Sequence, residues 1–396
     1  MTKKSPQRIA TFASSLIGDT LMATSLYRAL RIQYPNAELT LLSEVPEHPV
    51  LDGFNTFDRI TEYRSDLDLD NHYDLIVLPV FCGDAKVRAN FDRLKNLVSL
   101  DRLHSELRQS WRNKWSGDYT HLLFYKHQFE LNTDLARAAG YSGEMPPLYC
   151  PQGDPALYRH LKGRVGLFIN TPQNEFQALP NRQWPSTHWK ELIDALGPLK
   201  VVLVGGSSDL PNLKLLAAET SATYEATATI SDFTALCRNL NALVTTDGGG
   251  MHVAATTGVP IVSLHGTSSP ILLHPWIYPG GKCIAIQAPN TCSPCQRSLR
   301  LRLCEQGITR MACMERVDAS MVKRALDEIE RMNSGGCVIL KGKDFMTRET
   351  YLKSWRRKLL SNVNYNLARI TLRLHRGDYH STVSGHPQTP HELLPR

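Results

Sequence analysis

A run of three glycines marks the segment best suited to binding an anion. Residues 246–255 read Thr-Asp-Gly-Gly-Gly-Met-His-Val-Ala-Ala and link an apolar run at 242–245 to an expected helix over 252–257. Glycines let the backbone approach a phosphate closely, and the N–H groups at a helix start favour negative charge. Asp247 is placed to cap the helix or to accept hydrogen bonds, and His252 to touch phosphate or sugar. The pattern also fits a tight turn before a buried helix, with His252 as a core residue.

A carboxylate near the N-terminus is the second candidate. Asp19 follows Gly18, after an expected strand at 9–12 and before an expected helix over 20–33. Aspartate is common at an N-cap, where it stabilises a helix by about 1 kcal/mol. A carboxylate at the end of a strand is also a suitable general base for a hydroxyl group. The local sequence leaves both roles open.

A cation in a third segment completes the set. Arg182 precedes Trp184-Pro185 and an expected helix over 188–196. Its permanent charge and planar fork of donors suit a pyrophosphate. A solvated loop cation fits the local sequence equally well.

The elements that must position these residues form two series of alternating strands and helices. Unbroken apolar strands between helices are typical of parallel sheets covered on both faces. We therefore expect two Rossmann-like domains facing across a cleft, over 1–160 and 161–337, because the rhythm restarts at Val165 after a Pro- and Gly-rich stretch. The expected strands are 9–12, 38–42, 75–78, 165–169, 201–204, 242–245 and 261–264, and the expected helices are 20–33, 188–196, 211–219, 232–240 and 252–257. Two ligands meeting in such a cleft suggest a transferase.

Composition excludes several classes of protein. With 42% hydrophobic and 21% charged residues the chain is not largely disordered, and its longest apolar run, 75–82, is too short to span a membrane. Nine cysteines without an export signal indicate reduced thiols and a cytoplasmic location.

Region 84–130 is rich in charged and aromatic residues, and its apolar residues follow neither a helical nor a strand period. This region fits either an insertion that faces the acceptor or an irregular pair of helices.

The net charge of +7 belongs to the C-terminal segment 338–396. Residues 341–396 hold eleven Lys or Arg and four Asp or Glu, and the rest of the chain is neutral, so we expect no nucleic acid partner. Within 353–376 apolar residues recur every three or four positions among Arg and Lys, which predicts a basic amphipathic helix. Such a helix can pack on the protein body or lie on the inner leaflet of a membrane.

The three segments together resemble the family 9 glycosyltransferases, the heptosyltransferases of lipopolysaccharide core assembly. Gly18-Asp19 with the helix ending in Arg28-Ala29-Leu30 is similar to their first signature. Asp247 to Ala255, followed by Gly258-Val259-Pro260, is similar to their second, and Arg182 to Pro185 to their lysine-x-Trp-Pro segment. The resemblance covers about residues 8–335. The sequence differs from the family pattern at two positions: Gly248 stands where the family usually has a hydroxyl residue, and Arg182 stands where it has lysine.

This resemblance implies a GT-B fold and an inverting, metal-independent transfer of a heptose from ADP-heptose to a lipopolysaccharide inner-core acceptor, with no cofactor required. It implies that Asp19 is the general base. The donor-binding set that it implies consists of Arg182, Glu225, Asp247, Gly248, Gly249, Gly250, Met251 and His252. The cations and backbone dipoles of that set would stabilise charge on the leaving diphosphate.

Four further cysteines have spacings that suit a tetrahedral metal. Cys292, Cys295, Cys304 and Cys313 can hold a structural zinc or iron, or can be reduced packing thiols.

Other functions also fit parts of the sequence. They are a transferase that uses another nucleotide sugar or a protein acceptor, and a non-catalytic membrane-associated scaffold. A dinucleotide oxidoreductase is disfavoured, because no Gly-x-Gly-x-x-Gly follows any expected strand.

Overall fold

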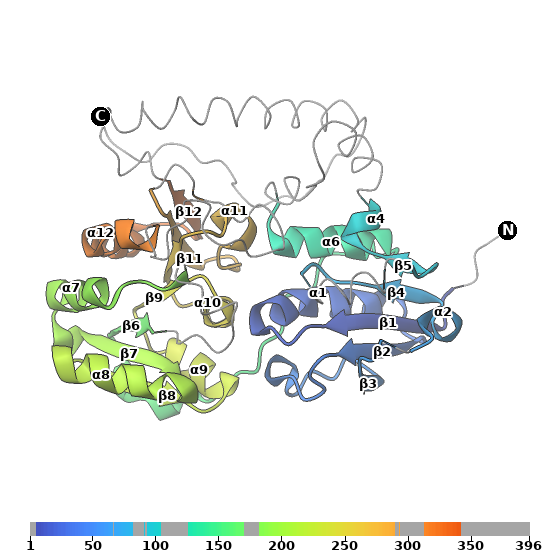
Figure 1. Cartoon of the computed structure of the whole chain (residues 1–396), viewed down its shortest axis with the longest axis horizontal. Helices are drawn as coiled ribbons and strands as arrows, with labels where there is room; N and C mark the ends of the chain where they lie inside the picture. The colour runs from blue at the N-terminus through green and yellow to red at the C-terminus, as the bar shows by residue number, and fades with distance from the viewer. Residues whose placement is uncertain are drawn as a thin grey trace, which may run out of the picture.

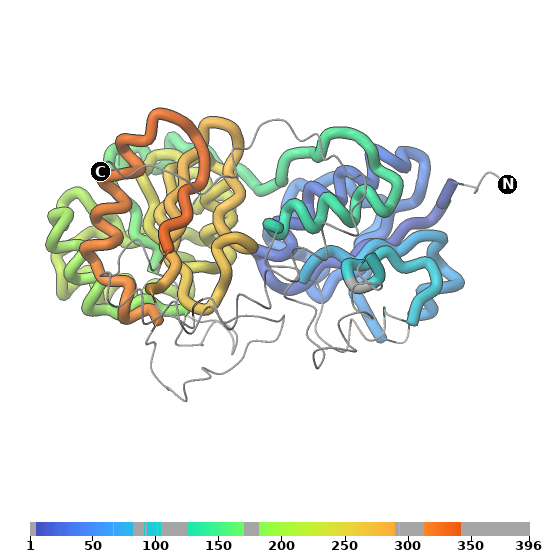
Figure 2. Tube along the Cα trace, turned by 90° about the horizontal axis from the view of Figure 1, so that it is seen from above, coloured from blue at the N-terminus to red at the C-terminus, as the bar shows by residue number. Residues whose placement is uncertain are grey.

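The chain forms two α/β units that lie side by side, one built around each of two parallel sheets (Figures 1 and 2). This arrangement comes from a computed structural model that describes residues 5–65, 67–81, 91, 93–103, 126–169, 182–289, 293 and 313–341. Within these residues, no helix has the length and apolar character needed to cross a membrane. The amphipathic pattern at 353–376 and most of region 84–130 lie outside them.

The first unit has a five-stranded parallel sheet in the order β3-β2-β1-β4-β5. Helices α1 and α6 pack against each other on this unit. The central strands β1 and β2 are buried at five of six positions, which explains their unbroken apolar runs. The elements are β1 (Arg8–Ala13), α1 (Ile17–Gln33), β2 (Glu38–Ser43), η1 (Pro49–Leu51), β3 (Arg59–Glu62), α2 (Leu69–His72), β4 (Leu75–Val77), β5 (Leu97–Val98), α4 (Leu100–Leu103) and α6 (Gln128–Ala138).

The second unit has a seven-stranded parallel sheet in the order β12-β11-β10-β9-β6-β7-β8. Counted within the unit this is 3-2-1-4-5-6-7, which extends the Rossmann order and places the switch point between β6 and β9. The elements are η3 (Pro155–Leu161), β6 (Val165–Phe168), α7 (Ser186–Leu196), η5 (Pro198–Lys200), β7 (Val201–Gly206), η6 (Ser207–Asp209), α8 (Leu210–Thr220), β8 (Thr223–Thr227), α9 (Ile230–Cys237), β9 (Ala242–Thr246), α10 (Gly249–Ala255), β10 (Ile261–His265), α11 (Pro270–Leu273), β11 (Lys282–Gln287), η7 (Met314–Arg316), α12 (Ala319–Arg331) and β12 (Gly336–Leu340).

All seven expected strands are present, as β1, β2, β4, β6, β7, β9 and β10. The sequence analysis missed β3, β5, β8, β11 and β12. Strands β3 and β8 are sheet edges with mostly exposed or half-buried residues, so they lack the apolar run that marks a central strand. Pairing with a neighbouring strand, rather than their own sequence, makes them strands.

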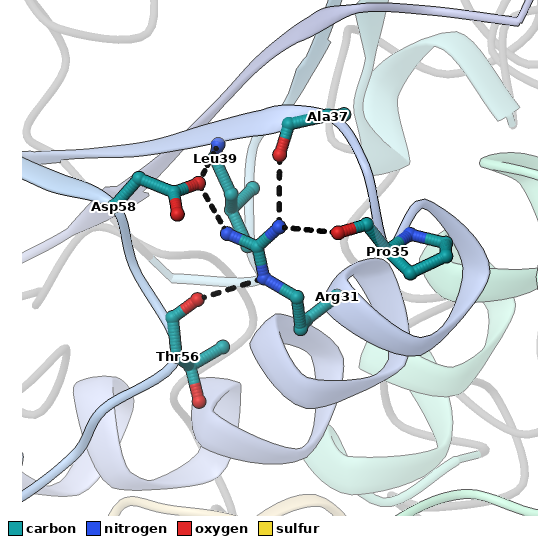
Figure 3. Close-up of polar contacts among 6 residues, drawn as sticks. All are labelled: Arg31, Pro35, Ala37, Leu39, Thr56 and Asp58. Carbon is teal, nitrogen blue, oxygen red and sulfur yellow. Dashed lines mark hydrogen bonds and ion pairs between the residues drawn. The ribbon is translucent and has the colours of Figure 1, made fainter.

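Arg31 ties the C-terminal end of α1 to the sheet (Figure 3). Its Nε donates to the carbonyl of Thr56 at 3.1 Å, its Nη1 to the carbonyl of Ala37 at 2.8 Å, and its Nη2 to the Asp58 carboxylate. Asp58 also accepts from the backbone N–H of Leu39 at 2.7 Å. That N–H and the Arg31 guanidinium lower the pKa of Asp58 despite its partial desolvation. The direction of α1 is thereby fixed, and with it the position of the opposite end of the helix.

Candidate functional site

The two units meet where α1 and α10 begin. A methyl group added to Gly18 would lie 3.0 Å from His252 Cδ2, and one added to Gly249 would lie 3.1 Å from Ile17 Cβ. Glycine at both positions therefore permits a close approach of the two helix starts, which lie next to each other in Figure 1. The structure thus brings the Gly18-Asp19 segment against the triple-glycine segment.

Asp19 lies in the first turn of α1, half-buried beside this contact. The interpretation of Asp19 as an N-cap is wrong: the N-cap is Leu16, because α1 begins at Ile17 rather than at Thr20. Asp19 Oδ1 accepts a hydrogen bond from Gln128 Nε2 at 3.0 Å. Gln128 is the first residue of α6, and the sequence analysis missed it, because no motif surrounds it and it lies 109 positions from Asp19.

Buried Asp247 and half-buried Arg182 form a charge pair at the end of β9. Arg182 Nη2 lies 3.7 Å from Asp247 Oδ2. At this distance the two groups form an ion pair, but the separation is too long for a hydrogen bond between these atoms. Burial alone would raise the pKa of Asp247, but Arg182, His265, His252 and a hydrogen bond with Ser268 together lower it. Asp247 is therefore a carboxylate at neutral pH. It does not cap α10, whose N-cap is Gly248 with no side-chain hydrogen bond.

The three glycines have different roles. Gly248 is extended at the N-cap, and Gly249 allows the approach to Ile17. A methyl group on Gly250 would lie 2.6 Å from Phe168 Cζ, so this glycine makes room for a ring of β6. The N–H of Met251 donates to the Gly248 carbonyl at 3.1 Å, so this amide already has a partner within the turn. Part of the glycine pattern thus serves packing, which the anion-binding interpretation did not anticipate.

Two buried histidines flank this loop in their neutral form. Burial lowers the pKa of His252 and of His265 to about 4 in each case. The ring nitrogens of His265 lie 3.0 Å from Ser263 Oγ and 3.3 Å from Ser268 Oγ, so this histidine belongs to a polar network that reaches Asp247 through Ser268. That network connects β10 and the loop after it to the charge pair.

Several buried polar atoms near this contact and in the loop after β10 have no hydrogen-bond partner within the described residues. They are Gln128 Oε1, Asp247 Oδ2, His252 Nδ1 and Thr267 Oγ1. Buried polar groups in folded proteins are nearly always paired, so a group of exceptions at one place calls for an explanation. Atoms of this kind are what a bound polar ligand would satisfy.

Glu225 lies apart from this group. It is on the edge strand β8, where its carboxylate oxygen is 3.0 Å from His160 Nε2. No contact that we describe connects it with Arg182 or Asp247. Its proposed role in nucleoside binding stays a prediction.

Of the four clustered cysteines, only Cys313 is described, and it is half-buried; Cys292, Cys295 and Cys304 lie outside the described residues. Among the described residues, no group of three or more His, Cys, Asp or Glu side chains could hold a metal ion.

Comparison with known proteins identifies relatives of both units. Residues 162–304 match the model of glycosyltransferase family 9 (heptosyltransferase). The chain is 27% identical over 298 residues to lipooligosaccharide heptosyltransferase 2 of Haemophilus influenzae, covering 66% of this chain and 84% of that protein.

Two solved structures have the same fold. A family 9 glycosyltransferase from Veillonella parvula aligns with a TM-score of 0.59 at 15% identity, over 82% of this chain and 97% of that one. The ADP-heptose lipopolysaccharide heptosyltransferase II of Escherichia coli aligns with a TM-score of 0.55 at 19% identity, over 81% of this chain and 98% of that one.

Two parallel sheets covered by helices, with the candidate site where the units meet, together with these structural likenesses define a GT-B α/β fold. The match of residues 162–304 to a glycosyltransferase family and the likeness to curated heptosyltransferases make the protein a glycosyltransferase by class. Residues 162–304 carry the family 9 domain, and the chain is similar to the family's curated lipopolysaccharide heptosyltransferases.

Proposed function

We propose that this enzyme transfers a heptose from ADP-heptose to a lipopolysaccharide inner-core acceptor, with inversion at the anomeric carbon and without a metal in the chemical step. The family description and the names of the relatives support the substrate classes. The observation that carries the proposal is the contact between the starts of α1 and α10, with a carboxylate on one side and a half-buried cation with helix amides on the other.

On the acceptor side the base is Asp19. As the acceptor oxygen forms its bond to the anomeric carbon, its proton passes to the Asp19 carboxylate. The bond from that carbon to the diphosphate oxygen breaks on the opposite face, and the electron pair leaves with ADP. The half-buried position of Asp19 beside the contact between the units supports this role.

On the donor side, negative charge grows on the leaving diphosphate. Arg182 and the backbone N–H groups of Gly249 and Gly250 are the groups that would stabilise it. The carboxylate of Asp247 would repel a phosphate, so its role is to hold the Arg182 guanidinium and the loop in place. Neutral His252 supplies a hydrogen bond to phosphate or sugar without adding charge.

The remaining parts of the proposal rest on the sequence and on its resemblance to the family. We place the enzyme in the cytoplasm, with segment 353–376 at the inner face of the membrane, and assign Glu225 to the nucleoside. The cysteine cluster stays a candidate structural zinc or iron site with no part in these steps.

The decisive variant is Asp19→Asn. Asparagine keeps the size of the side chain and still accepts from Gln128, but it cannot take a proton. We expect kcat to fall by about 10²- to 10⁴-fold, with ADP affinity unchanged in calorimetry. Transfer at the wild-type rate would show that Asp19 is not the base.

A second experiment identifies the donor. The wild-type enzyme is incubated with a panel of nucleotide sugars and the product masses are measured; we expect ADP-heptose to be the preferred donor.

A further inference from the structure

The start of α6 is held by the second unit. His127 Nδ1 accepts from the N–H of Phe129 at 3.1 Å, so the ring carries its hydrogen on Nε2, which donates to the carbonyl of His274 at 2.8 Å. The ring of Phe129 stacks on Trp276 with centroids 4.2 Å apart and planes at 14°. The residues on both sides of Gln128 are thus anchored to segment 274–276.

Gln128 itself is completely buried and points one end at Asp19. An ionised carboxylate only accepts hydrogen bonds, so the amide nitrogen must face Asp19 and the amide oxygen must face away. That oxygen is buried, with no hydrogen-bond partner among the residues that the structure describes. Within the described residues, the amide nitrogen of Gln128 therefore makes a hydrogen bond and its amide oxygen makes none.

A second buried amide one turn further along α6 gives a matched comparison. Asn132 is also completely buried, and both of its ends are used. Its Nδ2 donates to the carbonyl of Met22 at 3.0 Å, and its Oδ1 accepts from the N–H of Val80 at 3.0 Å. A role in holding the fold together explains why an amide stands at position 132, because these bonds join α6 to α1 and to the segment after β4.

A role in stabilising the fold does not explain why an amide stands at position 128. A buried acceptor without a partner lowers stability, and an apolar side chain of the same length would fill the space without that cost. An amide at this place therefore needs another reason. Among the described residues, the one group that this amide contacts by a hydrogen bond is the carboxylate of the proposed base.

We propose that Gln128 is a positioning residue for the transfer reaction: it orients the Asp19 carboxylate and keeps it ionised, and it does so from a helix start that the second unit holds in place. This inference rests on the proposed function, in which Asp19 is the base. A donated hydrogen bond favours the charged form of a carboxylate. Because segment 274–276 anchors both neighbours of Gln128, contact between the units also sets the geometry of the base.

The test compares Gln128→Met, Gln128→Glu and Asn132→Leu, with ADP-heptose and a truncated lipopolysaccharide as the probes. For Gln128→Met we expect kcat to fall about ten- to a hundredfold. The acidic limb of the pH–rate profile should move to higher pH by about half a pH unit or more, because Asp19 loses a donor to its charged form. Tm should not fall. Gln128→Glu places a second carboxylate beside Asp19, so its acidic limb should move further. Asn132→Leu should lower Tm and leave the acidic limb in place.

Three outcomes separate this inference from the proposed function. If Gln128→Met keeps the wild-type kcat and acidic limb while Asp19→Asn is inactive, the positioning role is wrong and the proposed base stands. If Gln128→Met lowers Tm and kcat without moving the acidic limb, the role is structural and the inference is also wrong. If Asp19→Asn transfers heptose at the wild-type rate, the proposed function itself fails.

Discussion

At its C-terminal end α1 carries Arg31, whose guanidinium donates to three backbone carbonyls and to the Asp58 carboxylate. At its N-terminal end the same helix carries Asp19, beside a glutamine oxygen and near a histidine nitrogen that have no hydrogen-bond partner in the described part of the chain. The first end is an arrangement that fixes a helix. The second leaves hydrogen-bonding capacity for something that is not part of the chain.

This contrast separates charges that build the fold from charges that act on a ligand. Each end carries a charged residue, Asp19 just before the expected helix 20–33 and Arg31 within it, and the residue types do not show which charge serves the fold. The structure distinguishes them by whether the polar atoms around each charge are already bonded. The same criterion distinguishes Asn132 from Gln128.

After Asp19→Asn, the largest effect should come from removing the cation that pairs with buried Asp247. Arg182→Gln should lower kcat by about 10²- to 10³-fold through loss of diphosphate stabilisation. It should also lower the free energy of unfolding by about 3 kcal/mol, because Asp247 would keep a buried charge without its cation. Steady-state kinetics and chemical denaturation measure the two effects.

Two further variants serve as controls. Arg182→Lys keeps the charge and should retain most of the activity. Adding Asp247→Asn to Arg182→Gln should restore stability but not the rate. If the double variant also recovers the rate, Arg182 serves the fold, as Arg31 does.

A smaller effect, on stability rather than on rate, is expected at the other end of α1. Arg31→Met removes several hydrogen bonds and leaves the carbonyls of Thr56 and Ala37 without this donor, which should cost about 2 kcal/mol. The ion pair with half-exposed Asp58 adds little to this. Arg31→Lys should recover only part of the loss, because an ammonium cannot reach all these acceptors at once. Denaturation curves measure the effect, and a kcat that falls in the fully folded variant would contradict it.

The smallest effect concerns pH. In the folded protein burial lowers the pKa of His252 to about 4, against about 6.5 when unfolded, so the unfolded state binds more protons between these values. The free energy of unfolding therefore falls as pH drops through that window. His252→Gln should reduce the loss between pH 7 and pH 5 by about 1–2 kcal/mol.

Asp58 provides the control for the pH prediction. Its pKa is lowered from an already acidic value, so its contribution is lost only below about pH 4. Asp58→Asn should therefore leave the slope between pH 7 and pH 5 unchanged. An unchanged slope in His252→Gln would show that this histidine is not held neutral by burial.

Much of the fold could be predicted, because central strands of parallel sheets are buried on both faces and appear as apolar runs. Edge strands β3 and β8 could not, since half-exposed strands have no such run. The three segments carrying Asp19, Arg182 and the triple glycine were also recognisable, because each follows or precedes an expected element at a short, fixed spacing.

What the sequence determined by itself was thus the alternation of strands and helices and the residue types at their ends. Tertiary structure decided which of these ends meet, and it added Gln128 and the Ser263–His265–Ser268 network to the site. It also showed that Gly250 makes room for Phe168. The physical reason is distance along the chain: a local pattern records burial and helix or strand preference, whereas a bond between residues 109 positions apart exists only after two helices have packed together.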